Sequence, residues 1–171
     1  MRGSHARWGN ELMRRQLADG YELDDDPTRI DVDAVFAYIS GESYWGRSRS
    51  HERVARAIAG SRRVLGLYRD DELVGFARAV SDGAIMAYLA DVYVLAEHRG
   101  RGLGLALVKE MIDGCEQWDA RWMLHTADAQ GLYAKLGFVQ DAPTYTLMER
   151  ERGSRAGQAR ADPSPSSLPR P

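Results

Sequence analysis

Apolar side chains recur at three- and four-residue spacing in four stretches of the chain, which predicts four amphipathic helices. These helices are expected at about residues 31–40, 50–59, 103–118 and 129–136. Ser50 is a good N-terminal cap for the second helix, because its hydroxyl oxygen can accept a hydrogen bond from a free backbone N–H group. Gly41, Gly60 and Gly137 stand where three of the helices should end, and glycine readily adopts the backbone conformation that closes a helix.

β-branched and aromatic residues gather in shorter runs, which predict six strands. The runs cover residues 20–24, 64–68, 73–80, 85–94, 121–125 and 144–148. Polar turn sequences at 69–72 and 81–83 separate the second, third and fourth runs, so these are expected to pair as an antiparallel meander. Two strand–helix units follow. The sequence therefore predicts an α/β domain of the α+β type, with a mixed, mostly antiparallel sheet and helices on both faces.

The two ends of the chain lack these patterns. Residues 1–17 are expected to form a flexible leader, since MRGSH resembles an expression leader and Met13 is a plausible alternative start. Residues 18–150 are expected to form the domain. Residues 151–171 hold four of the six prolines and only one leucine, so they bury too little apolar surface to offset ordering and should be disordered.

Composition excludes several classes of function. The net charge of −2 and the pI near 6.1 argue against general binding to nucleic acid or to a membrane surface. No run approaches the roughly 18 apolar residues of a membrane span. Cys115 is the only cysteine and can form no internal disulfide, which suits a reducing compartment, and we expect the cytoplasm. The four histidines show no metal-ligand spacing, so no metal is expected.

The stretch from Asp91 to Leu107, DVYVLAEHRGRGLGLAL, carries the strongest chemical signal. It passes from a strand through a basic, glycine-rich turn into an apolar helix. Free N–H groups at a helix start, together with the helix dipole, attract anions, and glycine lets the backbone approach a bulky phosphate. Arg99 and Arg101 add guanidinium groups suited to phosphate oxygens. The predicted ligand is a pyrophosphate; the alternative is an Arg- and Gly-rich turn with a satisfied helix start.

Two common pyrophosphate motifs do not fit this stretch. A P-loop requires lysine followed by Ser or Thr, where Leu105 and Ala106 stand, and residues 102–107 do not supply G-x-G-x-x-G. What remains is R-x-x-G-x-G directly after a V-x-V strand. This motif resembles the coenzyme A loop of the GNAT superfamily, the small acyl-CoA-dependent N-acyltransferases. Residues 129–138, AQGLYAKLGF, closely resemble the second GNAT signature, A-x-x-L-Y-x-K-x-G-F.

The resemblance covers roughly Tyr21 to Met148 and implies a sheet splayed open at its centre, between the strands at 85–94 and 121–125. It implies acetyl-CoA as co-substrate, with the pantothenate arm lying in the gap. Thr126 stands where many members have Asn, and could cap the helix or donate a hydrogen bond. The residues implied in coenzyme binding are Val92, Val94, Arg99, Gly100, Arg101, Gly102, Leu103, Gly104 and Thr126.

The reaction implied is direct attack of a neutral amine on the acetyl thioester. A backbone N–H group near Val94, freed where the strands part, can polarise the thioester carbonyl. Tyr133 matches the family tyrosine that protonates the departing thiolate, and the alternative is that it only caps the core.

The general base has two candidates, Asp91 and His125. Alternation along the strand is expected to place Leu89, Asp91 and Tyr93 on one face, opposite Val92 and Val94. Asp91 could then take the amine proton through water, hold a cationic substrate or pair with an arginine. His125 could equally be a structural histidine.

The acceptor pocket in this family is built largely from the first two helices and their connection. The resemblance therefore implies an acceptor site with Glu42, Tyr44 and Trp45, and with Arg78 from the meander. Glu42 suits an ammonium group and the aromatic side chains suit an apolar or cationic body; the alternative is that the aromatics only cover the core. A free amine, an amino acid, a polyamine, an antibiotic and a protein N-terminus all remain open as acceptors.

The sequence thus predicts a cytoplasmic, acetyl-CoA-dependent N-acetyltransferase that acts on a primary amine of a small molecule or peptide. The alternatives are an acyl-CoA-binding sensor or regulatory module without turnover, and an interaction module that uses the tail. The expected partners are acetyl-CoA and the amine, without nucleic acid or membrane, and the chain is a monomer or a homodimer.

Overall fold

The computed structural model describes residues 12–114 and 120–140. The strand predicted at 144–148, the tail and Cys115 lie outside these residues. The chain divides into two units, Met1–Phe138 and Val139–Pro171, and the fold described below is that of the first.

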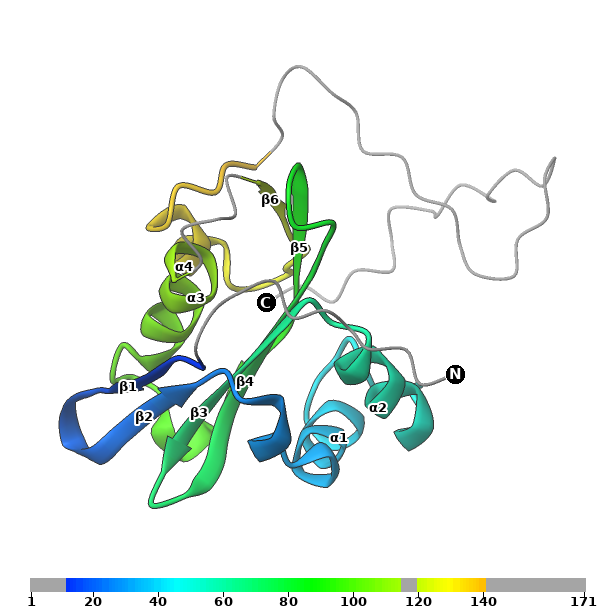
Figure 1. The fold of residues 1–171 in the computed structure, drawn as a ribbon, viewed down its shortest axis with the longest axis vertical. Coiled ribbons are helices and arrows are strands. Elements are labelled where there is room, and N and C mark those ends of the chain that lie inside the picture. The colour runs from blue at the N-terminus through cyan, green and yellow to red at the C-terminus, as the bar shows by residue number, and fades with distance from the viewer. Residues whose placement is uncertain (1–11, 115–119, 141–171) are drawn as a thin grey trace, which may run out of the picture. The chain divides into compact units, whose positions relative to one another are not determined.

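A six-stranded sheet forms the middle layer of the described residues, in the order β1-β2-β3-β4-β5-β6 (Figure 1). Its strands are β1 Arg14–Gln16, β2 Tyr21–Asp24, β3 Arg63–Arg69, β4 Glu72–Ser81, β5 Met86–Val94 and β6 Arg121–Met123. All neighbouring strands are antiparallel except β5 and β6, which run parallel. The predicted meander and the mixed, mostly antiparallel sheet are therefore confirmed.

Helices cover both faces of this sheet, as predicted (Figure 1). One face carries α1 Val32–Gly41 and α2 His51–Ala59, and the other carries α3 Leu103–Asp113 and α4 Gln130–Ala134. Short 3-10 turns lie at η1 Ala18–Gly20, η2 Pro27–Arg29 and η3 Ala96–His98. No helix in the described ranges combines the length and the apolar character needed to cross a membrane.

Side-chain caps explain where α1 and α2 begin. The Asp31 carboxylate accepts a hydrogen bond from the Ala34 N–H group, and the Ser50 hydroxyl oxygen accepts from the Arg53 N–H group. Each cap satisfies one of the N–H groups that have no partner inside the helix.

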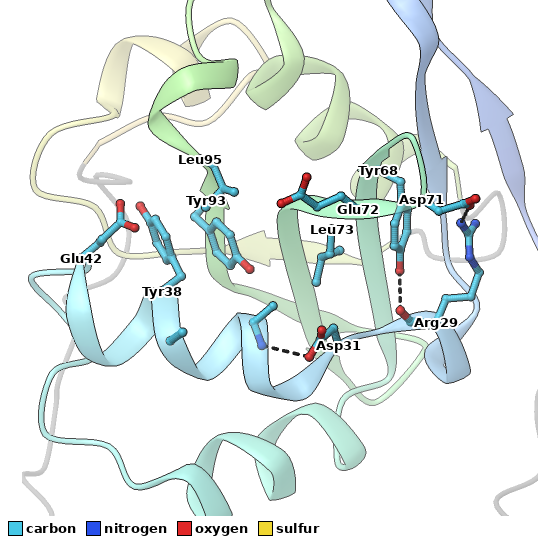
Figure 2. Close-up of a pocket in the computed structure, with 12 residues that line it drawn as sticks. Arg29, Asp31, Tyr38, Glu42, Tyr68, Asp71, Glu72, Leu73, Tyr93 and Leu95 are labelled. Atoms are coloured by element: carbon cyan, nitrogen blue, oxygen red, sulfur yellow. Dashed lines mark hydrogen bonds and ion pairs between the residues drawn. The ribbon is translucent and has the colours of Figure 1, made fainter.

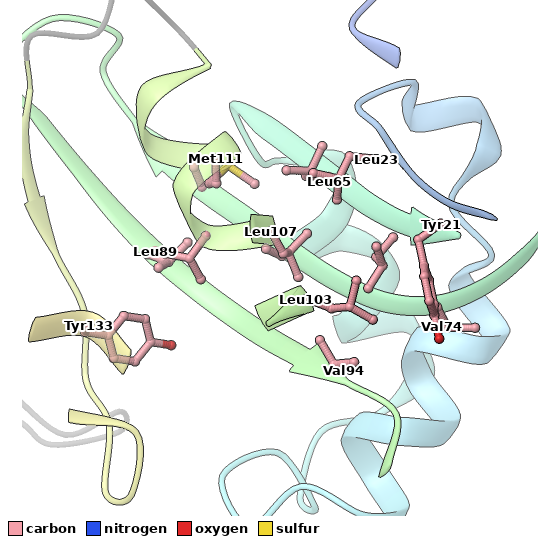
Figure 3. Close-up of a cluster of buried hydrophobic side chains, with 14 residues drawn as sticks. Tyr21, Leu23, Leu65, Val74, Leu89, Val94, Leu103, Leu107, Met111 and Tyr133 are labelled. Atoms are coloured by element: carbon pink, nitrogen blue, oxygen red, sulfur yellow. The ribbon is translucent and has the colours of Figure 1, made fainter. Parts of the chain in front are cut away.

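Two hydrophobic cores lie on opposite sides of the sheet. Figure 3 shows the core beneath α3, where Leu103, Leu107 and Met111 pack against strand residues such as Leu65 and Leu89. The core beneath α1 and α2 joins helix and strand side chains, and its fully buried members are Val35, Ile39, Val54 and Phe76. Apolar side chains are thus buried between the sheet and the helices on both faces, which stabilises the fold.

The N-terminal strand differs from the predicted organisation, which placed residues 1–17 in a leader. Residues 14–16 form β1, which pairs with β2 through Arg14↔Asp24. The Arg14 Nε atom lies 2.6 Å from Glu22 Oε2 and ties the two strands together. All three residues of β1 are polar and exposed, so no alternating pattern marks this strand in the sequence.

A β-bulge interrupts β5 beside its contact with β4. Phe76 pairs with Tyr93 but Arg78 pairs with Ala90, so two residues of β5 lie opposite one residue of β4. Within the bulge, Asp91 has a φ angle of 53°, in the left-handed region.

The bulge changes which side chains share a face of β5. Leu89 packs in the core beneath α3, whereas Tyr93 packs in the core beneath α1 and α2. The prediction that Leu89 lies on the same face as Asp91 and Tyr93 is therefore wrong. Strict alternation holds only while the pairing register is constant, and one extra residue reverses every side chain beyond it.

Replacement of a core leucine tests the packing of α3. Leu107 is fully buried beneath the helix, and Leu107→Ala should lower the free energy of unfolding by about 2–5 kcal/mol. Leu105→Ala, two residues earlier on a half-buried position of the same helix, should lower it by about 1 kcal/mol. Urea denaturation of both variants gives the comparison, and equal losses would contradict this account of the core.

Candidate functional site

β5 and β6 pair for only three residues and then separate. The paired residues run from Met86↔Arg121 to Tyr88↔Met123. Beyond them the Leu95 N–H group donates to the Val74 carbonyl oxygen on β4 at 2.9 Å, so alternation directs the backbone of Val94 to the opposite, unpaired edge. The sheet is thus splayed where the sequence predicted, and β5 has an open edge there.

A cavity of about 230 Å³ lies where the two strands part. Its walls come from the loop after α1, from β4 and β5, from the segment after β6, and from α4. Seven residues predicted for the site line it: Tyr44, Trp45, Arg78, Asp91, Val92, Thr126 and Tyr133. The fold therefore brings together residues that are up to 89 positions apart, from Tyr44 to Tyr133.

Tyr133 lies on α4 and is 9 % exposed. Its ring packs edge-on against Phe138, with the ring centroids 5.8 Å apart, and Figure 3 shows it at the border of the core. Its hydroxyl group makes no hydrogen bond with the described part of the chain. Burial raises the pKa of Tyr133 to about 12, with a smaller effect from Tyr44. The phenol is therefore protonated at neutral pH.

The Asp91 carboxylate is held by two arginines. Its Oδ1 atom lies 2.7 Å from Arg49 Nη1, and its Oδ2 atom lies 2.6 Å from Arg78 Nε. Both oxygens thus accept charge-assisted hydrogen bonds. Of the roles considered for Asp91, this geometry favours pairing with arginine.

The loop after α1 is tied across the cavity to the segment before α4. The Tyr44 hydroxyl oxygen accepts a hydrogen bond from the Ala127 N–H group at 3.1 Å and donates a weaker one to Asp128 at 3.5 Å. Trp45 lies beside it under the Arg49 guanidinium group, 5.2 Å from the ring centroid. These contacts place two aromatic side chains at the cavity wall.

Thr126 holds the segment before α4: its Oγ1 atom accepts a hydrogen bond at 3.0 Å from the N–H group of Ala129, the N-terminal cap residue of the helix. No side chain caps α4 itself, so the helix cap expected of Thr126 is not formed. Its hydroxyl hydrogen stays available for a further acceptor.

The glycine loop leaves the start of α3 open to an anion. Gly100 and Gly102 have φ angles of 77° and 76°, which side chains with a Cβ rarely adopt. Gly102 is the N-terminal cap residue of α3, and no side chain caps the helix there. Leu103 is buried in the core, so only its backbone faces this end of the helix. Uncapped N–H groups at a helix start favour a bound anion.

The two arginines of the loop differ in their contacts. The Arg99 Nε atom donates to the Val94 carbonyl oxygen at 2.8 Å, and Arg99 Nη2 donates to the Tyr38 hydroxyl oxygen at 3.0 Å. Arg101 is exposed and forms no ion pair or hydrogen bond within the described residues. Arg99 therefore holds the loop against the end of β5, while Arg101 is free to bind an anion.

Of two other candidates, Glu42 and His125, only Glu42 lies apart from this cavity. Glu42 lines a second cavity on the α1 side of the sheet. His125 lies in the first cavity, where its Nδ1 atom is 2.7 Å from the Tyr88 hydroxyl oxygen. Among residues 12–114 and 120–140, no group of three His, Cys, Asp or Glu side chains could hold a metal ion.

Sequence reasoning did not find Arg49, the partner of Asp91. The two residues are 42 positions apart, and Arg49 lies in a loop without a periodic pattern. All but two of the 23 Lys and Arg residues are arginine, so the residue type did not distinguish Arg49 from the others.

Comparison with known proteins gives a consistent family signal. Residues 24–138 match a family model described as the acetyltransferase (GNAT) family. A solved structure from Xanthomonas campestris pv. campestris, assigned to the same family, is 36% identical, with a TM-score of 0.72 over 77% of this chain and 93% of that chain.

Curated relatives carry acetyltransferase names as well. The protein FG08082 of Gibberella zeae is 29% identical over 135 residues, which cover 67% of this chain and 76% of that protein. The Arabidopsis thaliana GCN5-related N-acetyltransferase 2, chloroplastic, is 40% identical over 75 residues. That match covers 43% of this chain and 29% of the plant protein, so this chain spans less than a third of the plant protein's length.

The ion pairs of Asp91 predict that replacing two aspartates of the same cavity has unequal effects on stability. Asp91→Asn removes the charge between Arg49 and Arg78 and should lower the free energy of unfolding by about 1.5–3 kcal/mol. Asp128→Asn, an exposed acid that lines the same cavity, should change it by about 0.5 kcal/mol or less. Urea denaturation measures both, and a larger loss for Asp128→Asn would refute the assignment.

Proposed function

The chain belongs to the GNAT acetyltransferase family, and we propose that it transfers the acetyl group of acetyl-CoA to a primary amine of a small molecule or peptide. The observation that carries this proposal is the cavity at the open edge of β5, where Tyr133, Thr126 and Val92 meet near the glycine loop. A protonated phenol, a free strand edge and an uncapped helix start are the groups that such a transfer requires.

The described residues that could bind acetyl-CoA lie in order from the start of α3 to the open edge of β5. The backbone N–H groups at the start of α3 and the free Arg101 would bind the pyrophosphate, and Gly100 and Gly102 keep side chains out of its way. The open backbone edge at Val92 and Val94 would pair with the pantothenate arm. The co-substrate supplies an activated acetyl thioester at the far end of this path.

Two groups of the chain would stabilise the charges that develop during the transfer. The Val94 carbonyl oxygen is occupied by Arg99, so the Val94 N–H group remains to polarise the thioester carbonyl. Tyr133 would protonate the departing thiolate, since its hydroxyl group holds its proton and the residue lines the same cavity. We propose that Asp91 fixes Arg49 and Arg78 and does not take the amine proton, because both its oxygens already accept hydrogen bonds.

The acceptor amine would lie against Tyr44, Trp45 and Arg78, which line the cavity. Glu42 is not part of this wall. We expect the reaction to take place in the cytoplasm, because the single cysteine suits a reducing compartment.

A panel of primary amines incubated with acetyl-CoA tests the proposal. Release of free CoA thiol that depends on one class of amine, together with the acetylated amine by mass spectrometry, is the expected result. Binding of acetyl-CoA without thiol release for any amine would instead favour a module that binds acyl-CoA without turnover.

Substitutions at Gly104 test the donor path. The added Cβ would lie 3.4 Å from Leu132 Cδ1, an ordinary contact, so Gly104→Ala should fold normally. Gly104→Val places a branched side chain at the helix start and should abolish acetyl-CoA binding. For the unmodified chain, acetyl-CoA at about 100 times its Kd should stabilise the fold by about 2.7 kcal/mol. Thermal unfolding with and without acetyl-CoA measures this, and an equal response of the valine variant would mean that the ligand binds elsewhere.

The role of Tyr133 is tested by Tyr133→Phe, which keeps the ring but removes the donated proton. The rate of acetyl transfer should fall by about 10²–10⁴-fold, while acetyl-CoA affinity should stay nearly unchanged. A full rate in this variant, with binding intact, would exclude Tyr133 as the acid.

The pH profile gives an independent check of the same residue. Because the pKa of Tyr133 is raised to about 12, its protonated form persists at pH values well above neutral. The rate in the unmodified chain should therefore show no fall from loss of this proton below about pH 10. Steady-state rates across the alkaline range measure this, and a fall below about pH 10 that disappears in Tyr133→Phe would contradict it.

A further inference from the structure

A second cavity, of about 410 Å³, opens on the α1 side of the sheet (Figure 2). Residues of η2, α1, the turn between β3 and β4, and the end of β5 surround it. Neither Tyr133 nor Val92 lines it, so it lies apart from the proposed transfer site. Its size is within the usual range for small-molecule sites.

The charges around this cavity are mostly negative. Four acidic residues line it, Asp31, Glu42, Asp71 and Glu72, against the single arginine Arg29. Glu42 and Glu72 form no ion pair within the described ranges. The cavity therefore holds carboxylates that are not neutralised by the chain itself.

Arg29 does not neutralise the acidic residues that line the cavity, because it already forms ion pairs with two buried carboxylates. Its Nη1 atom lies 2.6 Å from Glu22 Oε1 and 2.5 Å from Asp24 Oδ2. Its guanidinium group also covers the face of Tyr68, 4.2 Å from the ring centroid. The only acid of the cavity that it contacts is the exposed Asp71, at 3.2 Å.

Tyr93 provides a second, independent sign of a ligand. The residue is 4 % exposed, and its ring stacks on Tyr38 at a centroid distance of 3.9 Å. Figure 2 shows its hydroxyl group directed into the space between α1 and Leu73. This hydroxyl has no hydrogen-bond partner among the described residues. The ring is buried but the hydroxyl oxygen is accessible from the cavity, because the only fully buried side-chain atom without a hydrogen bond in the described residues is Arg63 Nη2. A bound molecule can therefore form the hydrogen bond that the chain does not supply.

The side chains that line the cavity indicate which class of molecule binds there. Burial raises the pKa of Tyr93 well above its ordinary value, so the hydroxyl is neutral, and its oxygen can accept a hydrogen bond from a positively charged N–H group. An anion is disfavoured by the surrounding carboxylates. Those carboxylates do not converge as metal ligands in the described part of the chain. Aromatic rings beside unpaired carboxylates suit an organic cation.

We propose that this cavity binds an organic cation that carries a primary ammonium or guanidinium group, with Tyr93 as hydrogen-bond acceptor and Glu42 and Glu72 as counter-charges. This would be a site in addition to the acceptor position beside Tyr133. Tyr38 connects the two regions, because its hydroxyl oxygen accepts from Arg99 of the glycine loop.

Isothermal titration calorimetry on the full chain tests the proposal with 1,4-diaminobutane as the probe. The uncharged analogue 1,4-butanediol is the matched ligand control. Saturable binding of the diamine, without comparable binding of the diol, is expected, and the affinity should fall as salt is raised.

Three variants locate the probe. Tyr93→Phe keeps the ring and removes one hydrogen bond, so the diamine Kd should rise about fivefold. The double variant Glu42→Gln with Glu72→Gln should weaken binding by about tenfold and flatten the dependence on salt. Glu52→Gln, an exposed glutamate on α2 outside the cavity, should leave the Kd unchanged.

The opposite pattern would overturn the proposal. Equal affinities for the diamine and the diol would show that binding does not depend on the positive charge of the ligand. An unchanged Kd in both the Tyr93 and the glutamine variants would mean that the probe does not occupy this cavity. Loss of binding in Trp45→Ala, with full binding in the glutamine variant, would assign the probe to the cavity between β5 and β6.

Discussion

β5 runs beside β6 for three residue pairs and then continues without a strand partner, and most features of the site depend on this separation. Backbone N–H and C=O groups require partners, so an unpaired strand edge inside a domain is a binding surface. Arg99 takes the Val94 carbonyl oxygen, and the start of α3 brings further free N–H groups close by. Tyr133 of α4 lines the cavity at the same gap.

The two cavities lie at different positions on one sheet and differ in charge. Near the split, Arg49 and Arg78 share the carboxylate of Asp91 and Asp128 also lines the cavity, so the formal charges there balance. On the α1 side, unpaired carboxylates surround stacked tyrosines. The bulge in β5 contributes to both environments, because it directs Asp91 and Tyr93 to the same face although Leu89 points to the other.

Local features of the sequence were sufficient to predict the helices, the strands from β2 to β6 and the glycine loop, as the cap at Ser50 illustrates. The bulge at Asp91 was not predictable, since it depends on pairing with β4 and not on any local pattern. Tertiary contacts such as Arg49 with Asp91 join loops far apart in sequence, and the sequence alone gives no register for them. The family signature located Tyr133, but only the packing around α4 accounts for its raised pKa.

The short contact between β5 and β6 also has a consequence for local stability. Three parallel residue pairs and the hydrogen bonds of Tyr44 are prominent attachments of the segment that carries Thr126 and α4. Segments with few backbone hydrogen bonds open more readily than the strands of a central meander. A ligand arm laid along β5 would act as a substitute strand, so amide exchange in this segment should slow when the gap is filled. Binding of the acetyl donor along β5 would then also order the segment that carries Thr126 and α4.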